Sequence, residues 1–322
     1  MGLKLGLLST ADINEKLVAG ARLADEVDVV AVASRTLDRA REQAGSLEIP
    51  RALGSYEELL ADPDVDAVYI SLPNSMHVDW SVRALEAGKH VLCEKPLARS
   101  VAEVERAFDA ADAAGLVLAE AFMWRHHPQA KRLVELLPRV GPLRVVRAQF
   151  SFGLHSLEPT SNIRLSGELE GGALMDVGCY CVSAARLLAG EPESVTGQQV
   201  TGEVDLRFTA TLSFPGEVLA HFDCGVDMAV RAELEVAGAD GRLLLHDPFH
   251  SLEPVIELHA ADGSVELIEA DRDNPYACEL RDFAAAVAGE RAPLLGRDDA
   301  VGQARTIAAL YKSAQSGTRV IV

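Results

Sequence analysis

Up to about Ala121 the chain alternates between short apolar runs and segments with helical spacing. The runs Leu3–Leu8, Val27–Ala33, Ala67–Ser71 and His90–Cys93 are each followed by an amphipathic segment. The second run is β-branched and apolar on both faces, as a strand covered by helices on both sides requires. Strands and helices that alternate with short links build a parallel sheet with right-handed crossovers. We therefore predict an α/β fold that begins with a parallel-sheet domain.

After about Met123 the pattern changes to a series of β-rich runs, with hairpin-type turns at Pro215-Gly216 and Asp240-Gly241. Helical spacing remains at Ala173–Leu188, Ala277–Ala288 and Asp298–Ser316. This pattern predicts an α+β domain with a large open, mainly antiparallel sheet and a few helices on one face. The expected boundaries are residues 1–122 and 123–322. By analogy with such folds, the other sheet face is expected to pack on a second copy, giving a homodimer or homotetramer.

The net negative charge of the chain argues against nucleic acids and anionic membranes as partners. The chain carries 49 acidic and 30 basic residues, a formal net charge of -19. A surface this negative repels nucleic-acid phosphates and anionic membranes, so neither is an expected partner. No run approaches the roughly 18 apolar residues of a membrane helix. A small-molecule substrate is the expected partner.

The cysteines give no sign of a disulfide or metal framework. There are five, an odd number at scattered positions. Cys179 and Cys181 lie two apart, with no second Cys or His pair at zinc spacing nearby. The apolar stretch at the N-terminus is too short for a signal peptide. We therefore expect a cytoplasmic protein without a metal.

Ligands of parallel α/β sheets bind beyond the carboxyl ends of the strands. The segments expected at that edge are Ser9–Asp12, Ser34–Arg35, Leu72–Asn74 and Glu94–Pro96. They lie far apart in the sequence, but the topology brings the ends of parallel strands to one side. This edge is the candidate ligand site.

The first strand–turn–helix is where a dinucleotide fingerprint belongs, yet the turn Ser9-Thr10-Ala11-Asp12-Ile13 contains no glycine. Small residues still let the backbone approach a pyrophosphate, and Ser9 and Ala11 are small. The hydroxyls of Ser9 and Thr10 are expected to donate to phosphate oxygens, and the helix N-terminus adds a positive end. These five residues are therefore predicted to bind a cofactor.

The residues at the end of the second strand indicate which dinucleotide the chain is expected to bind. NAD enzymes usually place an acid there to hold the ribose 2′-hydroxyl, whereas this chain has Ser34-Arg35. A hydroxyl and a guanidinium suit a 2′-phosphate, so NADP is predicted over NAD. The alternative interpretation is a helix cap followed by a surface arginine.

Several motifs together resemble one family. They are AVASRTLDRA at Ala31–Ala40, DPDVDAVYISLPNSMH at Asp62–His77, CEKPLA at Cys93–Ala98, AEAFMWRHHPQ at Ala119–Gln129 and GGALMDVGCYCVSAARLL at Gly171–Leu188. With these motifs the sequence resembles the Gfo/Idh/MocA oxidoreductases over essentially its whole length. Glu-Lys-Pro alone is not specific, but it is fairly specific when a Leu-Pro-Asn turn precedes it.

The resemblance implies an N-terminal Rossmann domain, a nicotinamide cofactor and hydride transfer at an alcohol carbon of a sugar, cyclitol or related compound. It places Lys95 at the family's active-site lysine and implies a cis bond between Lys95 and Pro96. Tyr180 stands where the family often has His. That is similar to the branch with glucose–fructose oxidoreductase, dimeric dihydrodiol dehydrogenases, NADP-dependent aldose dehydrogenases and sugar 3-ketoreductases.

Oxidation of an alcohol releases a proton as well as a hydride, so the site needs a proton-handling group. Tyr180 is the candidate, and the ammonium of Lys95 would stabilise its phenolate. Asp176 lies four residues before Tyr180, which places both side chains on one helix face. Asp176 is expected to accept a substrate hydroxyl and to support the Lys95 charge. The alternative is that Asp176 is a first-turn acid and Tyr180 a half-buried core residue.

Other residues are expected around this centre. Glu94 is predicted to face the nicotinamide ribose or to orient Lys95, and Asn74 to contact the same ribose. The cofactor set is completed by Leu72, Pro73 and His77, the last being structural or cofactor-adjacent. The predicted substrate pocket comprises Trp124, Arg125, His155, Asn162, Arg164 and Tyr276. A core tryptophan with a surface arginine is the alternative for the first two.

These inferences predict an NADP-dependent oxidoreductase that acts on a secondary alcohol or ketone of a sugar, cyclic polyol or dihydrodiol. One alternative is a nucleotide-sugar 3-ketoreductase. It would need a basic groove for a diphosphate, and the candidates Arg144, Arg147, Arg164 and Arg186 do not cluster in the sequence. A second alternative is an NADP-sensing regulator, which would not need Lys95, Asp176 and Tyr180 together.

Overall fold

The computed structural model describes residues 2–158 and 162–322. The chain forms two compact units: Met1–His126 with Asp273–Val301, and His127–Arg272 with Gly302–Val322. The C-terminal part is therefore divided, since the stretch that begins at Asp273 returns to the first unit. Within the described residues, no helix combines the length and the apolar character needed to span a membrane.

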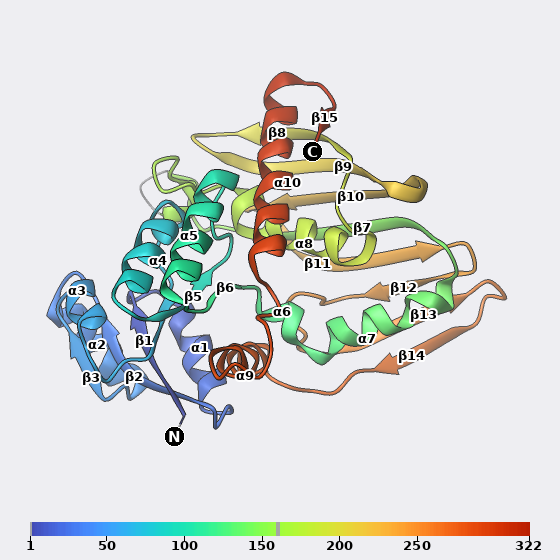
Figure 1. Cartoon of the computed structure of the whole chain (residues 1–322). Coiled ribbons are helices and arrows are strands. Elements are labelled where there is room, and N and C mark those ends of the chain that lie inside the picture. The colour runs from blue at the N-terminus through green and yellow to red at the C-terminus, as the bar shows by residue number, and fades with distance from the viewer. Residues whose placement is uncertain (1, 159–161) are drawn as a thin grey trace. The chain divides into compact units, whose positions relative to one another are not determined.

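The first unit contains a six-stranded sheet in the order β3-β2-β1-β4-β5-β6. Every neighbouring pair is parallel, which confirms the predicted Rossmann-type sheet (Figure 1). The order reverses between β1 and β4, and such a switch point is where α/β sheets bind ligands. The strands are β1 (Leu3–Leu8), β2 (Val27–Ala33), β3 (Arg51–Leu53), β4 (Ala67–Ile70), β5 (His90–Glu94) and β6 (Leu118–Ala121).

Helices cover this sheet, and α1 packs on α9 while α4 packs on α5. Gly20 permits the first contact, because a Cβ there would lie 2.6 Å from the Cβ of Tyr276. The helices of this unit are α1 (Ile13–Ala21), α2 (Leu37–Leu47), α3 (Tyr56–Leu60), α4 (His77–Glu86), α5 (Val101–Ala114), α6 (Met123–His126) and α9 (Pro275–Val287).

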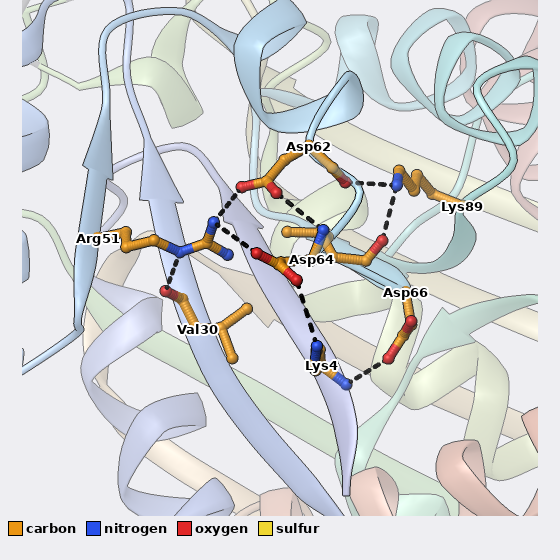
Figure 2. Close-up of polar contacts among 8 residues, drawn as sticks. Lys4, Val30, Arg51, Asp62, Asp64, Asp66 and Lys89 are labelled. Carbon is orange, nitrogen blue, oxygen red and sulfur yellow. Dashed lines mark hydrogen bonds and ion pairs between the residues drawn. The ribbon is translucent and has the colours of Figure 1, made fainter. Parts of the chain in front are cut away.

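A polar cluster fixes the segment that leads into β4 (Figure 2). The buried Lys89 donates to the carbonyl oxygens of Asp62 and Val65, both at 2.7 Å. Arg51, the first residue of β3, forms an ion pair with the Asp62 carboxylate at an N–O distance of 2.5 Å. These contacts lie at the amino ends of the strands, so the acidic part of the Asp62–His77 motif has a structural role.

The second unit contains a nine-stranded sheet in the order β14-β13-β12-β11-β7-β10-β9-β8-β15. Among the described strands of this second sheet, only β7 and β10 pair in parallel, which confirms the predicted mainly antiparallel sheet. The strands are β7 (Leu143–Gly153), β8 (Ser194–Thr201), β9 (Asp205–Phe214), β10 (Val218–Gly225), β11 (Asp227–Gly238), β12 (Gly241–Leu245), β13 (Val255–Ala260), β14 (Val265–Glu269) and β15 (Val320–Ile321).

The two faces of this sheet differ. Along β7, Val146, Ala148 and Phe150 are buried, while Arg147 between them is exposed. Helix α8 (Cys179–Ala189) packs on β7 and β10, and a π-helical turn, Leu174–Gly178, leads into it. The predicted helix from Ala173 thus exists but begins with a wider turn. The remaining helices are α7 (Pro128–Leu136) and α10 (Arg297–Ser316), the latter extending into this unit from the first.

Candidate active site

The turn after β1 is held by hydrogen bonds to buried groups of the same unit. The Ser9 hydroxyl is buried, 3.0 Å from the carbonyl oxygen and 2.7 Å from the hydroxyl of Ser71. In this structure the Ser9 hydroxyl makes its hydrogen bonds to the interior. Its predicted contact with a phosphate stays a prediction. Thr10 is less buried, and its Oγ1 lies 3.5 Å from the Ser34 Oγ at the end of β2.

Helix α1 begins directly after this turn. Its N-cap residue, Asp12, makes no side-chain cap. The first N–H groups of a helix lack intrahelical acceptors and form a positive end, which suits a phosphate. The predicted contacts of Asp12 and Ile13 with a pyrophosphate fit this geometry, whereas the Ala11 N–H already donates to the Ser9 Oγ. The cofactor roles of all three residues stay predictions.

Ser34 and Arg35 directly follow β2, and Arg39 lies in the first turn of α2. We name these three residues the β2 cluster. Within residues 2–158 and 162–322, neither guanidinium has a carboxylate partner. Burial raises the pKa of the Tyr56 phenol, and the charges of Arg35 and Arg39 oppose that rise, so both lie near this ring. Sequence reasoning missed Arg39. Its signal was the spacing of four residues from Arg35 at the start of a helix.

His77 joins two turns of the edge. One ring nitrogen lies 2.8 Å from the carbonyl oxygen of Leu72 and the other 2.9 Å from that of Pro96. The side chain is only 1% exposed. These contacts give His77 a structural role, since it ties the Leu72–Asn74 turn to the turn after β5.

Glu94 is the last residue of β5, and Lys95 begins the turn that follows it. The Tyr69 hydroxyl donates to Oε1 of Glu94, while the Lys95 N–H donates to Oε2 at 3.3 Å. Burial and the charge of Glu94 raise the pKa of Tyr69 well above its usual value, so it remains a donor. Glu94 thus contacts the Lys95 backbone, and its two predicted roles stay predictions. The bond between Lys95 and Pro96 is cis, as the resemblance implied.

Three predicted pocket residues lie in the first unit. Trp124 is buried in α6, and the Arg125 guanidinium lies 5.8 Å from its ring centroid and 3.4 Å from Asp299. Tyr276 belongs to α9, because the helix begins one residue earlier, at Pro275. Their assignment to a substrate pocket stays a prediction.

In the second unit the structure joins two residues that were predicted separately. Arg164 Nε donates to Asp176 Oδ2 at 2.7 Å. Asn162 Oδ1 accepts from the Arg164 N–H at 3.0 Å and caps the short turn that carries Arg164. Asp176 is part of the π-helical turn, a feature that often marks functional sites. Asp176 therefore forms an ion pair with Arg164, a contact that sequence reasoning did not predict.

The diglycine before that turn permits close packing. A Cβ on Gly171 would lie 2.3 Å from the Arg164 carbonyl oxygen, and one on Gly172 would lie 2.2 Å from Asp205 Oδ1. Asp205 Oδ2 accepts from the Leu174 N–H at 2.7 Å. This buried carboxylate anchors the turn of Asp176, and sequence reasoning missed it because β9 is distant in the chain.

Tyr180 is the second residue of α8 and is 7% exposed. Its ring lies 5.3 Å from that of Phe150 and 5.4 Å from that of Phe249. Aromatic packing on two sides restricts the direction of the phenol, which suits a positioned proton donor. His155, two residues after β7, is exposed, and its pocket role stays a prediction.

Comparison with known proteins decides the family. Residues 10–122 match the model described as oxidoreductase family, NAD-binding Rossmann fold, and residues 129–244 match the GFO/IDH/MocA C-terminal domain. The chain belongs to the Gfo/Idh/MocA oxidoreductase family. It is 41% identical to D-xylose 1-dehydrogenase (NADP(+)) 2 from Haloferax volcanii, over 98% of both chains.

Solved structures of this family agree. An aldose–aldose oxidoreductase from Caulobacter crescentus, complexed with glycerol, aligns over 100% of both chains with a TM-score of 0.91 at 27% identity. A 3-ketoreductase from Actinomadura kijaniata, complexed with NADP and TDP-benzene, has a TM-score of 0.89 at 32% identity, over 97% of this chain and 98% of the other. The predictions of an oxidoreductase with a nicotinamide cofactor are confirmed.

Proposed function

We propose that this member of the Gfo/Idh/MocA family is an NADP-dependent dehydrogenase or reductase that acts on a secondary alcohol or ketone carbon of a sugar, cyclic polyol or dihydrodiol. One observation carries the proposal. The carboxyl edge of the six-stranded sheet presents the β2 cluster after β2 and, after β5, a lysine whose backbone N–H donates to Glu94. The first feature suits a 2′-phosphate and the second suits the reacting oxygen.

NADP fits the residues of this edge. The β2 cluster would hold the 2′-phosphate, the start of α1 the pyrophosphate, and the turns at Asn74 and Glu94 the nicotinamide ribose. Bound NADP supplies or accepts the hydride. The relatives from H. volcanii and A. kijaniata, described with NADP in their names, support this choice over NAD.

The catalytic step then needs a proton at the substrate oxygen. In the proposal, Lys95 donates a hydrogen bond to that oxygen and its charge stabilises the Tyr180 phenolate. Tyr180 takes the proton in oxidation and returns it in reduction. Asp176 accepts a neighbouring substrate hydroxyl, with its carboxylate held by Arg164.

The arginines of the second unit favour a sugar without a nucleotide. Arg186 is buried and its guanidinium binds Glu191 and Gln303. Arg147 pairs with Glu235 on the exposed sheet face. Arg164 is also paired, so three of the four candidate arginines bind carboxylates of this chain, and only Arg144 has no such pair within the described residues. We therefore rank the nucleotide-sugar 3-ketoreductase second and the NADP-sensing regulator third.

A panel of aldoses, cyclic polyols and dihydrodiols, assayed with NADP and NAD in parallel by nicotinamide absorbance, tests the function. Turnover of a free sugar or diol with NADP is the expected result. Tight NADPH binding without turnover of any compound would support the regulator. Turnover of nucleotide-linked ketosugars alone would support the ketoreductase.

Substitution of the β2 cluster tests the choice of cofactor. Arg35→Ala and Arg39→Ala should each raise the KM for NADP about 10- to 100-fold, because each removes a charged hydrogen bond. The KM for NAD should hardly change. Arg41→Ala is the matched control, since Arg41 lies on the same helix and pairs with Asp38. Equal effects on both cofactors would contradict the assignment.

We also propose that the open face of the nine-stranded sheet joins two copies in a homodimer or homotetramer. Thr196, Thr211, His221, Arg147 and Glu235 lie in one row across five neighbouring strands. These five residues are among those that line a cavity of about 620 Å³. The row carries both signs of charge, so association should weaken with salt. Sedimentation velocity that finds only monomer at micromolar concentration and low salt would overturn the proposal.

A further inference from the structure

The backbone of the first turn has an unusual conformation for a side-chain-bearing residue. Ser9 has a φ of 151°, a value that glycine adopts readily and other residues seldom do. Residues in such conformations persist only where the surroundings hold them, and they cluster at functional sites. The turn therefore has the backbone of a glycine turn without a glycine, and something must hold it there.

A buried hydrogen-bond chain provides that support. Asn14, on the first turns of α1, is fully buried, and its Nδ2 donates to the Ser9 carbonyl oxygen at 2.9 Å. Its Oδ1 accepts from the Ser71 hydroxyl at 2.8 Å. Because the Ser71 proton is used there, its oxygen accepts from the Ser9 hydroxyl at 2.7 Å. The Ser9 Oγ in turn accepts from the Ala11 N–H at 3.1 Å.

Gln43 of α2 completes this network of hydrogen bonds by contacting both Asn14 and the Ser9–Ala11 turn. Its Oε1 accepts from Asn14 Nδ2 at 2.8 Å, and its Nε2 donates to the Ala11 carbonyl oxygen at 3.2 Å. The turn is thus held at the Ser9 carbonyl, the Ala11 N–H and the Ala11 carbonyl. Asn14 and Ser71 reach it from α1 and from the end of β4, so three elements fix one turn. Each donor has a defined acceptor, which leaves little freedom for rearrangement.

We propose that Asn14, Ser71 and Gln43 are positioning residues for the cofactor, which hold the Ser9–Ala11 turn in the conformation that fingerprint glycines otherwise provide. The inference rests on the proposed function, because it places the NADP pyrophosphate on this turn. None of the three needs to touch the cofactor. Their effect is transmitted through the backbone of the turn and should be confined to the pyrophosphate.

The test compares two ligands that share the 2′-phosphate but not the pyrophosphate. Binding of NADPH and of adenosine 2′-monophosphate to the whole chain is measured by calorimetry for wild type, Gln43→Met and Ser71→Ala. Gln43→Met should weaken NADPH about three- to tenfold, the effect of one or two lost hydrogen bonds. Adenosine 2′-monophosphate should bind as in wild type. Ser71→Ala removes one hydroxyl and is the milder variant if Gln43→Met folds poorly.

Two controls separate the possible failures. Arg35→Ala should weaken both ligands, and Glu42→Gln, an exposed neighbour on α2, should weaken neither. The KM for the cofactor should rise in the network variants while the KM for substrate stays unchanged. Equal weakening of both ligands, or of neither, by Gln43→Met and Ser71→Ala would overturn the inference. A wild-type chain that does not bind NADPH would overturn the proposed function and this inference with it.

Discussion

Lys95→Met is expected to lower kcat by about 10³- to 10⁴-fold in both directions while NADPH still binds. Methionine keeps most of the length of lysine but removes the ammonium, so neither the reacting oxygen nor a neighbouring phenolate would be stabilised. The contact of the Lys95 N–H with Glu94 belongs to the backbone and survives the change. Steady-state rates in oxidation and reduction, together with NADPH fluorescence titration, provide the measurement.

Lys131→Met is the control for loss of a lysine, because Lys131 is exposed on α7. It should leave both kcat and NADPH affinity unchanged. A Lys95 variant that retains kcat within about tenfold would remove Lys95 from the chemical step. If NADPH binding vanished together with activity, Lys95 would be an anchor for the cofactor and the mechanism would need another proton path.

Tyr180→Phe should lower kcat by about 10²- to 10⁴-fold, the usual range for loss of a general acid–base group. Phenylalanine retains the ring that packs between Phe150 and Phe249, so the fold should tolerate it. The pH dependence of kcat/KM supplies a second readout. The limb that reports the proton-handling group should disappear in Tyr180→Phe, since the group itself is removed.

Tyr311→Phe is the matched control for loss of a buried phenol, because the Tyr311 hydroxyl donates to Asp205 at 2.8 Å. It should reduce the free energy of unfolding by about 1 kcal/mol without changing the shape of the pH–rate profile. A Tyr180→Phe enzyme with wild-type kcat and an unchanged profile would assign the proton to another residue. Its aromatic contacts would then be purely a matter of packing.

Much of the fold could be predicted because periodicity is local. Val27–Ala33 is apolar on both faces, and that pattern alone places it in a sheet covered on both sides. The exceptions are short or mixed elements. Arg51–Leu53 has only three residues, and Val255–Ala260 alternates Val, Ile and Leu with Glu and His. Three residues are too few to show a period, whereas the alternation in Val255–Ala260 is a strand signal that sequence reasoning overlooked.

The cofactor side of the site was also predictable to a useful degree. Ser34-Arg35 indicated NADP by residue type alone, once the end of the second strand was located. Arg39 escaped notice because its electrostatic effect on the Tyr56 phenol, which it shares with Arg35, appears only in the folded chain. The Ser9 hydroxyl was predicted to face outward, but its direction depends on Ser71, which is 62 residues away.

The sequence by itself determined the two sheet types, the turns at the carboxyl edge and the residue types that suit NADP, because each depends on neighbours within a few positions. Only the tertiary structure decided which polar groups meet. It joined Arg164 to Asp176, Tyr69 to Glu94 and Asn14 to both Ser9 and Gln43. Hydrogen bonds act over about 3 Å in space regardless of separation along the chain. A local sequence pattern therefore cannot predict which distant residues form them.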